Sequence, residues 1–156
     1  MTGATIRQAA GEDLAAIAQL RRESAQEQDG ELTDPGFDDR FTEWFARESS
    51  RRIFWLAESG GRPVGAMNLA VFERMPRPGR EPSRWGYLGN AFVLVAYRDQ
   101  GIGRQLIDAV LSYAGEHDFA RVVLNPSQRS IPFYRRAGFR SASELLVWTP
   151  RNTTDR

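Results

Sequence analysis

The stretch 97–106, "YRDQGIGRQL", places glycines and arginines in a spacing suited to anion binding. Gly101 and Gly103 directly precede the apolar periodicity of a helix, and Arg98 and Arg104 stand on either side of them. A helix start carries unpaired N–H groups and partial positive charge, and glycine lets a phosphate reach those groups without meeting a Cβ atom. Guanidinium groups add charge-assisted hydrogen bonds. This loop is therefore expected to bind a pyrophosphate; a tight turn into a helix is the alternative.

Two common phosphate-binding motifs are excluded by single positions. A dinucleotide fingerprint, G-x-G-x-x-G, needs glycine where Leu106 stands. A P-loop needs a lysine, and the sequence contains none. The ligand of this loop belongs to another class of phosphate compound.

Composition limits the chemistry that the chain can perform. The sequence has 156 residues, 41% of them hydrophobic, which predicts one domain over 1–150 with a polar tail at 151–156. There is no cysteine and a single His117, so thiolate chemistry, disulfides and a histidine-based metal site are not expected. No apolar run approaches the roughly 18 residues of a membrane span, and no basic-then-apolar leader is present. A cytoplasmic protein without metal or membrane contacts is expected.

Charge is nearly balanced overall but unevenly distributed. The formal net charge of +1 argues against nucleic-acid binding. Residues 23–48 contain nine acids against two arginines, whereas residues 74–140 contain eleven arginines against five acids. An acidic wall would concentrate cations, which favours a cationic small-molecule ligand there; a solvated acidic helix face is the alternative.

The pattern of apolar residues predicts the elements that position this loop. Strands are expected at 5–9, 52–59, 62–72, 85–95, 121–125 and 144–149, and helices at 11–24, 37–48, 102–117 and 130–138. The pair Gly60–Gly61 predicts a hairpin between two of the strands. In the last helix Ser130 is the expected N-cap, Pro132 lies in the first turn and Gly138 ends the helix.

The chain resembles the GCN5-related N-acetyltransferases (GNAT) in two motifs at the right separation. The family's Arg/Gln-x-x-Gly-x-Gly/Ala pattern matches Arg98, Gly101 and Gly103, and its Y-x-x-x-G-F pattern matches Tyr134, Gly138 and Phe139. The segment "TIRQAAGEDLAAIAQL" also looks like the family's first strand and helix, and the chain as a whole looks like a small bacterial member.

The resemblance implies an α/β (α+β) fold. The expected sheet is mixed and mostly antiparallel, has six to seven strands with helices on both faces, and splays apart between its fourth and fifth strands, here 87–95 and 121–125. Acetyl-CoA would enter that gap as co-substrate. The resemblance assigns its binding to the backbone near Phe92, Val93 and Val95, to the loop that contains Arg98, Gly101, Ile102, Gly103 and Arg104, and more weakly to Ser127.

The reaction implied is direct transfer of acetyl from sulfur to a primary amine, with backbone N–H groups stabilising the tetrahedral intermediate. Tyr134 matches the family tyrosine that protonates the departing thiolate, although a core tyrosine is the alternative. Asn90 is a candidate for orienting water or the acceptor; the alternative is a strand-bulge residue. The strand glutamate that serves some relatives as base is missing. Trp44, Phe45 and Trp55 are candidates for the acceptor pocket, or else core residues.

Three functions are thus open. The first is an N-acetyltransferase acting on a small, cationic amine. The second is a coenzyme A-binding regulatory protein without turnover. The third is an interaction module that uses the arginine-rich segment 74–84; dimers are frequent in the family, so a homodimer is also expected.

Overall fold

The computed structural model describes residues 3–150, and the predicted tail at 151–156 lies outside them. The chain divides into two compact units, Met1–Asn125 and Pro126–Arg156.

The first unit contains its helices and strands in the predicted order. Its elements are β1 (Thr5–Gln8), the 3-10 helix η1 (Gly11–Asp13), α1 (Leu14–Asp29), α2 (Phe37–Glu48), β2 (Arg52–Ser59), β3 (Arg62–Glu73), β4 (Arg84–Val93), the 3-10 helix η2 (Val95–Tyr97), α3 (Ile102–Glu116) and β5 (Val122–Val123).

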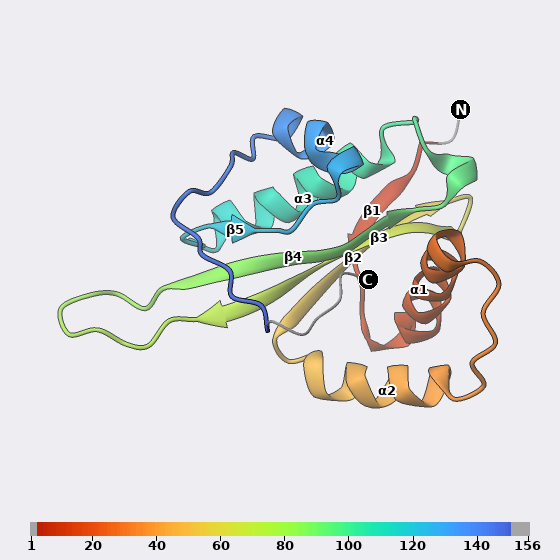
Figure 1. The fold of residues 1–156 in the computed structure, drawn as a ribbon, viewed down its shortest axis with the longest axis horizontal. Coiled ribbons are helices and arrows are strands. Elements are labelled where there is room, and N and C mark those ends of the chain that lie inside the picture. Colours follow the sequence, from red (N-terminus) through yellow and green to blue (C-terminus); the bar gives the residue numbers. More distant parts are fainter. Residues whose placement is uncertain (1–2, 151–156) are drawn as a thin grey trace. The chain divides into compact units, whose positions relative to one another are not determined.

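The strands form one mixed sheet in the order β1-β2-β3-β4-β5 (Figure 1). The first three pairings are antiparallel, and only β4 and β5 run parallel. Gly60 and Gly61 form the turn between β2 and β3 with positive φ angles of 57° and 78°, which confirms the predicted hairpin. The mixed, mostly antiparallel sheet is confirmed, but the described residues contain five strands where six to seven were expected.

Helices cover both faces of the sheet. Figure 1 shows α3 on one face and the α1–α2 pair on the other. Neighbouring residues of β2 point to opposite faces: Phe54 packs against Trp44 and Phe45 of α2, whereas Trp55 packs against Tyr113 of α3. The sheet is thus the middle layer of a three-layer arrangement, with a core on each side of it.

The sheet opens beside the second half of β4. Strand β5 pairs with β4 only at Gly86↔Val122 and Tyr87↔Val123. From Leu88 to Val93, no strand among residues 3–150 pairs with that edge of β4. The expected separation of the fourth and fifth strands is therefore present.

The second unit contains the 3-10 helix η3 (Gln128–Ser130) and α4 (Ile131–Arg136). Helix α4 begins after Ser130, has a proline in its first turn and is followed by Gly138 at φ 104°, as predicted. The strand predicted over 144–149 is wrong, because this segment has no regular secondary structure and Leu146 and Trp148 are 97% and 83% exposed. A run of apolar residues forms a strand only when a neighbouring strand pairs with it.

Within residues 3–150, no helix is both long and apolar enough to cross a bilayer, and no cluster of three or more acidic or histidine side chains is arranged to hold a metal ion.

Candidate active site

A β-bulge interrupts β4 next to the point where the sheet opens. Ala66 of β3 faces Phe92 and Asn68 faces Gly89, so the single residue Met67 opposes two residues of β4, Asn90 and the alanine that follows it. Asn90 has a positive φ of 52°, a conformation that asparagine tolerates better than most residues. Asn90 is thus a strand-bulge residue, which was one of its two predicted roles.

A hydrogen-bond chain fixes how the Asn90 carboxamide is turned. Asn68, which is 3% exposed, donates from Nδ2 to the Gly89 carbonyl at 3.1 Å and to Asn90 Oδ1 at 3.0 Å. Arg52 donates to Asn68 Oδ1 at 2.9 Å. Because a guanidinium only donates and a carbonyl only accepts, Asn68 has one possible orientation, and Asn90 must present its oxygen to it. The Nδ2 donors of Asn90 remain for other partners.

Glu48 at the end of α2 holds this chain in place. Its Oε2 accepts from Arg52 Nε at 2.8 Å, and its Oε1 accepts from Arg51 at 2.6 Å. Hydrogen bonds from Arg51 and then Arg52 lower the pKa of the Glu48 carboxyl from its ordinary 4.5 to about 2. The carboxyl therefore stays ionised at neutral pH, and the orientation of Asn68 and Asn90 does not change with pH in that range.

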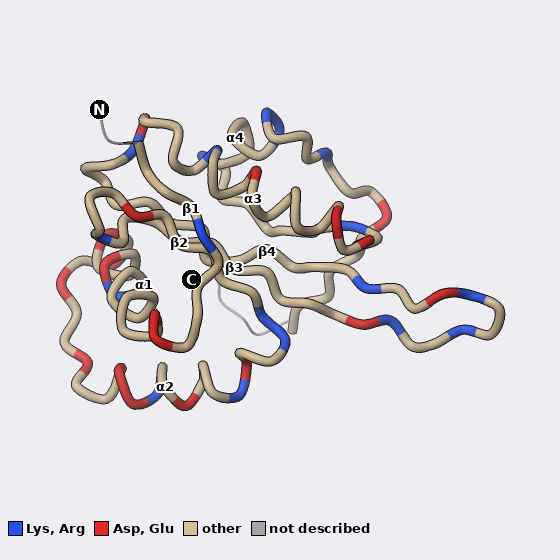
Figure 2. Tube along the Cα trace, turned by 180° about the vertical axis from the view of Figure 1, so that it is seen from behind, with Lys and Arg blue, Asp and Glu red and all other residues tan. Residues whose placement is uncertain are grey.

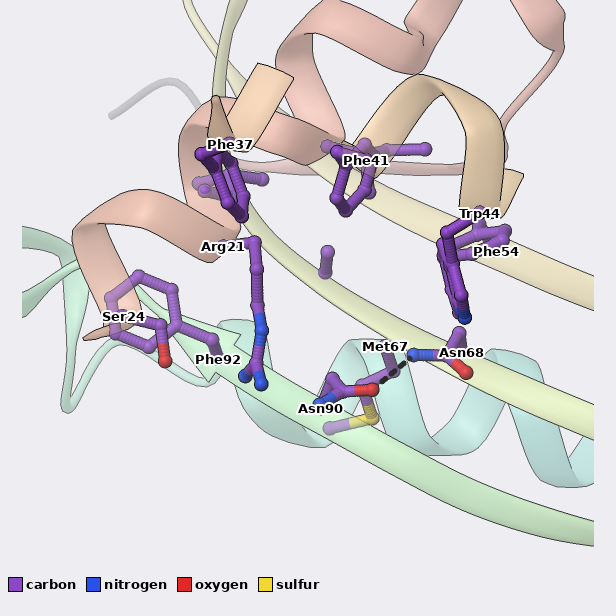
Figure 3. A pocket seen from close by; sticks show the side chains of 13 residues that line it. Arg21, Ser24, Phe37, Phe41, Trp44, Phe54, Met67, Asn68, Asn90 and Phe92 are labelled. Carbon is purple, nitrogen blue, oxygen red and sulfur yellow. Dashed lines mark hydrogen bonds between the residues drawn. The ribbon is translucent and has the colours of Figure 1, made fainter. Parts of the chain in front are cut away.

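A cavity of about 320 Å³ lies between the α1–α2 pair and the sheet (Figure 3). Its lining comes from α1 (Ile17, Leu20, Arg21, Ser24), α2 (Phe37, Phe41, Trp44), β2 (Phe54), β3 (Ala66, Met67, Asn68) and β4 (Asn90, Phe92). Figure 3 shows the aromatic rings of α2 facing the strands and Arg21 extending from α1 toward β4. The size and mostly apolar lining are typical of a small-molecule site.

The predicted acceptor residues divide between this pocket and the core. Trp44 lines the pocket, whereas Phe45 packs on Phe54 and Trp55 lies 3% exposed on the α3 side of the sheet. The aromatic residues of α2 are only half-buried, and none of that helix is fully buried.

The nine acidic residues of segment 23–48 do not line the pocket, although other residues of that segment do. Figure 2 shows its acidic residues along the connection from α1 to α2 and along α2 itself. Four of the nine acids pair with arginines: Glu27 with Arg98, Asp34 with Arg40, Asp38 with Arg22, and Glu48 with Arg51 and Arg52. Much of the local negative charge is therefore balanced on the protein surface.

The glycine loop leads into α3 as its residue types predict. Gly101 is the N-cap of α3 at φ 82°, a left-handed conformation that favours glycine, and a Cβ atom built there would meet nothing within 4 Å. Ile102 and Gly103 form the first turn, and Ile102 is 4% exposed, which anchors the helix start to the core. The N-terminus of this 15-residue helix therefore follows Gly101, which leaves room for a ligand.

The two flanking arginines have protein partners. Arg98 donates from Nε to the Val93 carbonyl at 2.9 Å and pairs with Glu27 through NH1 at 2.7 Å, and its guanidinium lies over the Phe92 ring. Arg104 pairs with Asp108 one turn along α3 at 2.9 Å. Arg98 therefore ties the end of β4 to α1 in this structure, and its contact with phosphate stays a prediction.

Tyr134 and Ser127 belong to the second unit. The Tyr134 ring contacts Phe133 and Phe139 at centroid distances of 5.0 Å and 5.6 Å, and burial raises the pKa of its phenol above the ordinary 10.0. A phenol in this state keeps its proton at neutral pH, as a proton donor must. Ser127 exchanges hydrogen bonds with Ser130 at the start of η3, and its contact with coenzyme A stays a prediction.

Several pocket residues carry no motif that would reveal them from the sequence. Arg21 and Ser24 fall on the side of α1 between its buried and exposed faces, and Phe37 and Phe41 read as core residues. Asn68 gave the clearest signal, since an amide within the apolar run "VGAMNLAVF" needs hydrogen-bond partners when buried.

Comparison with known proteins agrees with this architecture. The sequence profile of the acetyltransferase (GNAT) family matches residues 14–139, and the chain belongs to this family. A predicted acetyltransferase from Clostridium acetobutylicum, solved with acetyl-CoA, has the same fold: the TM-score is 0.74 at 21% identity, with 94% of this chain and 96% of that chain covered.

Two curated relatives are similar over part of their length. Glucosamine 6-phosphate N-acetyltransferase of Trypanosoma brucei brucei is 32% identical over 81 residues, which cover 52% of this chain and 53% of that protein. N-acetyltransferase family 8 member 2 of Rattus norvegicus is 33% identical over 97 residues, covering 60% and 41%. The chain spans about half the length of the curated relatives it matches.

Proposed function

We propose that the protein is an acetyl-CoA-dependent N-acetyltransferase that transfers the acetyl group directly to the primary amine of a small acceptor in a ternary complex. Family membership and the names of both curated relatives support this activity. The acceptor named for the trypanosomal relative is a small amine, which supports a small molecule as acceptor.

One observation carries the proposal: the second half of β4 has an unpaired edge and also lines the pocket. One edge, from Leu88 to Val93, has no strand partner among residues 3–150, while Asn90 and Phe92 of the same segment line the pocket beneath α1 and α2. An extended ligand pairing with that edge would meet an acceptor in the pocket at the bulge. This arrangement suits an enzyme with two substrates better than a protein that only binds coenzyme A.

The residues present fit acetyl-CoA. The unpaired β4 edge, near Phe92 and Val93, has backbone groups for the pantetheine amides, and Val95 continues the segment. The first turn of α3, behind Gly101 with Ile102, Gly103 and Arg104, has N–H groups and partial positive charge for the diphosphate. Bound acetyl-CoA supplies the activated acetyl group.

In the proposed reaction the acceptor nitrogen, as a neutral amine, attacks the thioester carbonyl carbon. A C–N bond forms, the tetrahedral intermediate collapses, and the C–S bond breaks. The Tyr134 phenol gives its proton to the departing thiolate, the nitrogen loses its extra proton to solvent, and the tyrosinate regains a proton from solvent. The Nδ2 donors of Asn90 hydrogen-bond an oxygen of the acceptor or of water and so position the amine. The products are an acetamide and free coenzyme A.

A thiol-release screen over diverse primary amines, followed by mass spectrometry of the product, tests this function. We expect amine-dependent release of coenzyme A together with an acceptor heavier by one acetyl group. If acetyl-CoA binds tightly but no amine releases coenzyme A faster than background hydrolysis of the thioester, the regulatory alternative is favoured.

A further inference from the structure

One side of the acceptor pocket consists of aromatic side chains that are only half-buried. Phe37, Phe41 and Trp44 follow one another along α2 with ring centroids 5.7 Å and 5.5 Å apart, and all three line the pocket. None of them is fully buried. Exposed apolar area costs about 25 cal/mol per Å², so a ligand that covers these rings with an apolar body gains affinity.

The polar groups of the same pocket are hydrogen-bond donors. Asn68 has used its amide and its oxygen within the chain that runs from Arg52 to Asn90, and Asn90, whose oxygen accepts from Asn68, has both Nδ2 hydrogens left for a ligand. Ser24 adds a hydroxyl. Within the described part of the chain, the lining contains no carboxylate. A ligand with acceptor oxygens therefore suits this part of the pocket.

Arg21 supplies the one positive charge of the lining. Figure 3 shows its side chain extending from α1 toward the strand that carries Asn90. Its neighbour Arg22 pairs with Asp38 and lies over Phe37, whereas Arg21 makes no hydrogen bond or ion pair within residues 3–150. A guanidinium without a partner, beside two amide hydrogens, is suited to a planar or tetrahedral oxyanion.

We propose that the acceptor is an amphipathic primary amine that also carries an anionic group, a carboxylate or a phosphate, held by Arg21 and Asn90 while its apolar body lies against the α2 aromatic residues. This inference rests on the proposed acetyltransferase function. It differs from the purely cationic acceptor that the acidic segment favoured: the amine is a cation before deprotonation in both cases, but the lining adds a requirement for an anion.

Matched pairs of amines test the requirement. Phenylalanine and phenethylamine, and tryptophan and tryptamine, differ only in the carboxylate; alanine keeps the carboxylate and lacks the body. Glucosamine 6-phosphate and glucosamine form the phosphate arm. We expect kcat/KM from thiol release to be about 10- to 100-fold higher for the anionic member of at least one pair, since hydrogen bonds to charged groups contribute about 1.5–3 kcal/mol. The arm with the larger ratio identifies the anion.

The variant Arg21→Met separates the charge from the rest of the pocket. It should remove that advantage by raising the KM of the anionic acceptor about 10- to 100-fold, while the KM of acetyl-CoA and the melting temperature stay constant. Arg47→Met is the matched control, because Arg47 is an exposed arginine of α2 outside the lining. It should leave the ratios unchanged.

The outcomes separate this inference from the proposed function. The anionic acceptor is overturned if amines without an anionic group are acetylated as fast as their anionic partners. It is also overturned if Arg21→Met leaves the kcat/KM ratios of the matched pairs unchanged. Either result leaves the acetyltransferase function intact. Absence of turnover for every amine, with acetyl-CoA bound, overturns both. Alanine acting as well as phenylalanine contradicts the apolar body.

Discussion

At the scale of single residues, the candidate site depends on side chains whose orientation is imposed by neighbours. Asn90 turns its amide hydrogens away from β3 because Asn68 donates to its oxygen, and Asn68 is fixed in turn by Arg52 and the Gly89 carbonyl. Tyr134 keeps its proton because burial raises the pKa of its phenol. Neither residue needs a charge of its own to take part in acetyl transfer.

Replacing Asn68 by aspartate tests the orientation of Asn90. In Asn68→Asp the donor toward Gly89 and Asn90 becomes an acceptor, so Asn90 has to rotate and present its oxygen to the pocket. We expect the acceptor KM to rise about tenfold and the free energy of unfolding to fall by about 1–3 kcal/mol, since buried acceptors lose their donor. Steady-state kinetics and urea unfolding measure these effects. An unchanged acceptor KM in a folded variant contradicts the role given to this chain.

Tyr134→Phe tests the proton donor. The substitution keeps the ring and its packing on Phe133 and Phe139 but removes the acidic hydrogen. Turnover should fall about 10- to 1,000-fold, overlapping the usual general-acid contribution of about 10²–10⁴, while acetyl-CoA affinity and melting temperature hardly change. With a thioester whose thiolate is a better leaving group, the deficit should shrink. If turnover falls equally with acetyl-CoA and with the other thioester, Tyr134 has a positioning role instead.

At the scale of elements, the proposed function ties the start of α3 and the end of β4 most closely to the co-substrate. Gly101 provides the left-handed N-cap, and Arg98 fastens the strand end to α1 through Glu27. The loop between them is thus held from both sides before any ligand binds, which lowers the entropy that binding must overcome.

Gly103→Val tests the approach of phosphate to the first turn of α3. A branched side chain would block the N–H groups, although valine is no worse than glycine for helix stability. The Kd of acetyl-CoA, measured by calorimetry, should rise more than tenfold while the melting temperature changes little. Gly115→Val in the last turn of the same helix is the control, since a Cβ atom there meets nothing within 4 Å. Normal binding by Gly103→Val would show that the phosphate lies elsewhere.

The start of α1 gives a prediction for acid stability. Asp13 is 8% exposed; hydrogen bonds from Arg7 and then from the Ala10 N–H lower the pKa of its carboxyl from 3.8 to about 2. Because the folded-state pKa is the lower one, this stabilisation is complete above pH 3.8 and disappears as the pH falls toward 2. Asp13→Asn should therefore be less stable than the wild type at pH 7, and the difference in unfolding free energy should shrink below pH 4. A constant difference down to pH 2 contradicts the assignment.

The elements could be read from the sequence far better than the site. Strong periodicity predicted α2 at 37–48 with its observed bounds, and the glycine pair predicted the β2–β3 turn. The pairing of Arg98 with Glu27 joins positions 71 residues apart, and no local pattern encodes it. The same holds for Arg21, whose place in the pocket follows from how α1 lies on the sheet. The strand predicted over 144–149 is wrong for a related reason: whether an apolar segment has a partner strand is also not encoded locally.

At the scale of the whole molecule, the proposed function requires two substrates. Acetyl-CoA should therefore stabilise the chain against heating, because a ligand that binds only the folded state adds about 2.7 kcal/mol at a hundredfold excess over Kd. For a chain of this size that is a rise of roughly 5–10 °C in melting temperature. Scanning fluorimetry with acetyl-CoA, and with NADH and ATP as controls, provides the measurement. No rise at millimolar acetyl-CoA contradicts the co-substrate assignment.

A single-turnover experiment with acetyl-labelled acetyl-CoA, and an acceptor found in the thiol-release screen, tests direct acetyl transfer to an amine. The sequence contains no cysteine to form a thioester with the protein, and direct attack needs both substrates bound at once. We expect the label to leave coenzyme A only when the acceptor is present, and to appear in the acceptor's amide and never on the protein. Label on the protein in the absence of acceptor would contradict direct transfer, and label that reaches no amine while acetyl-CoA is bound would contradict the enzyme.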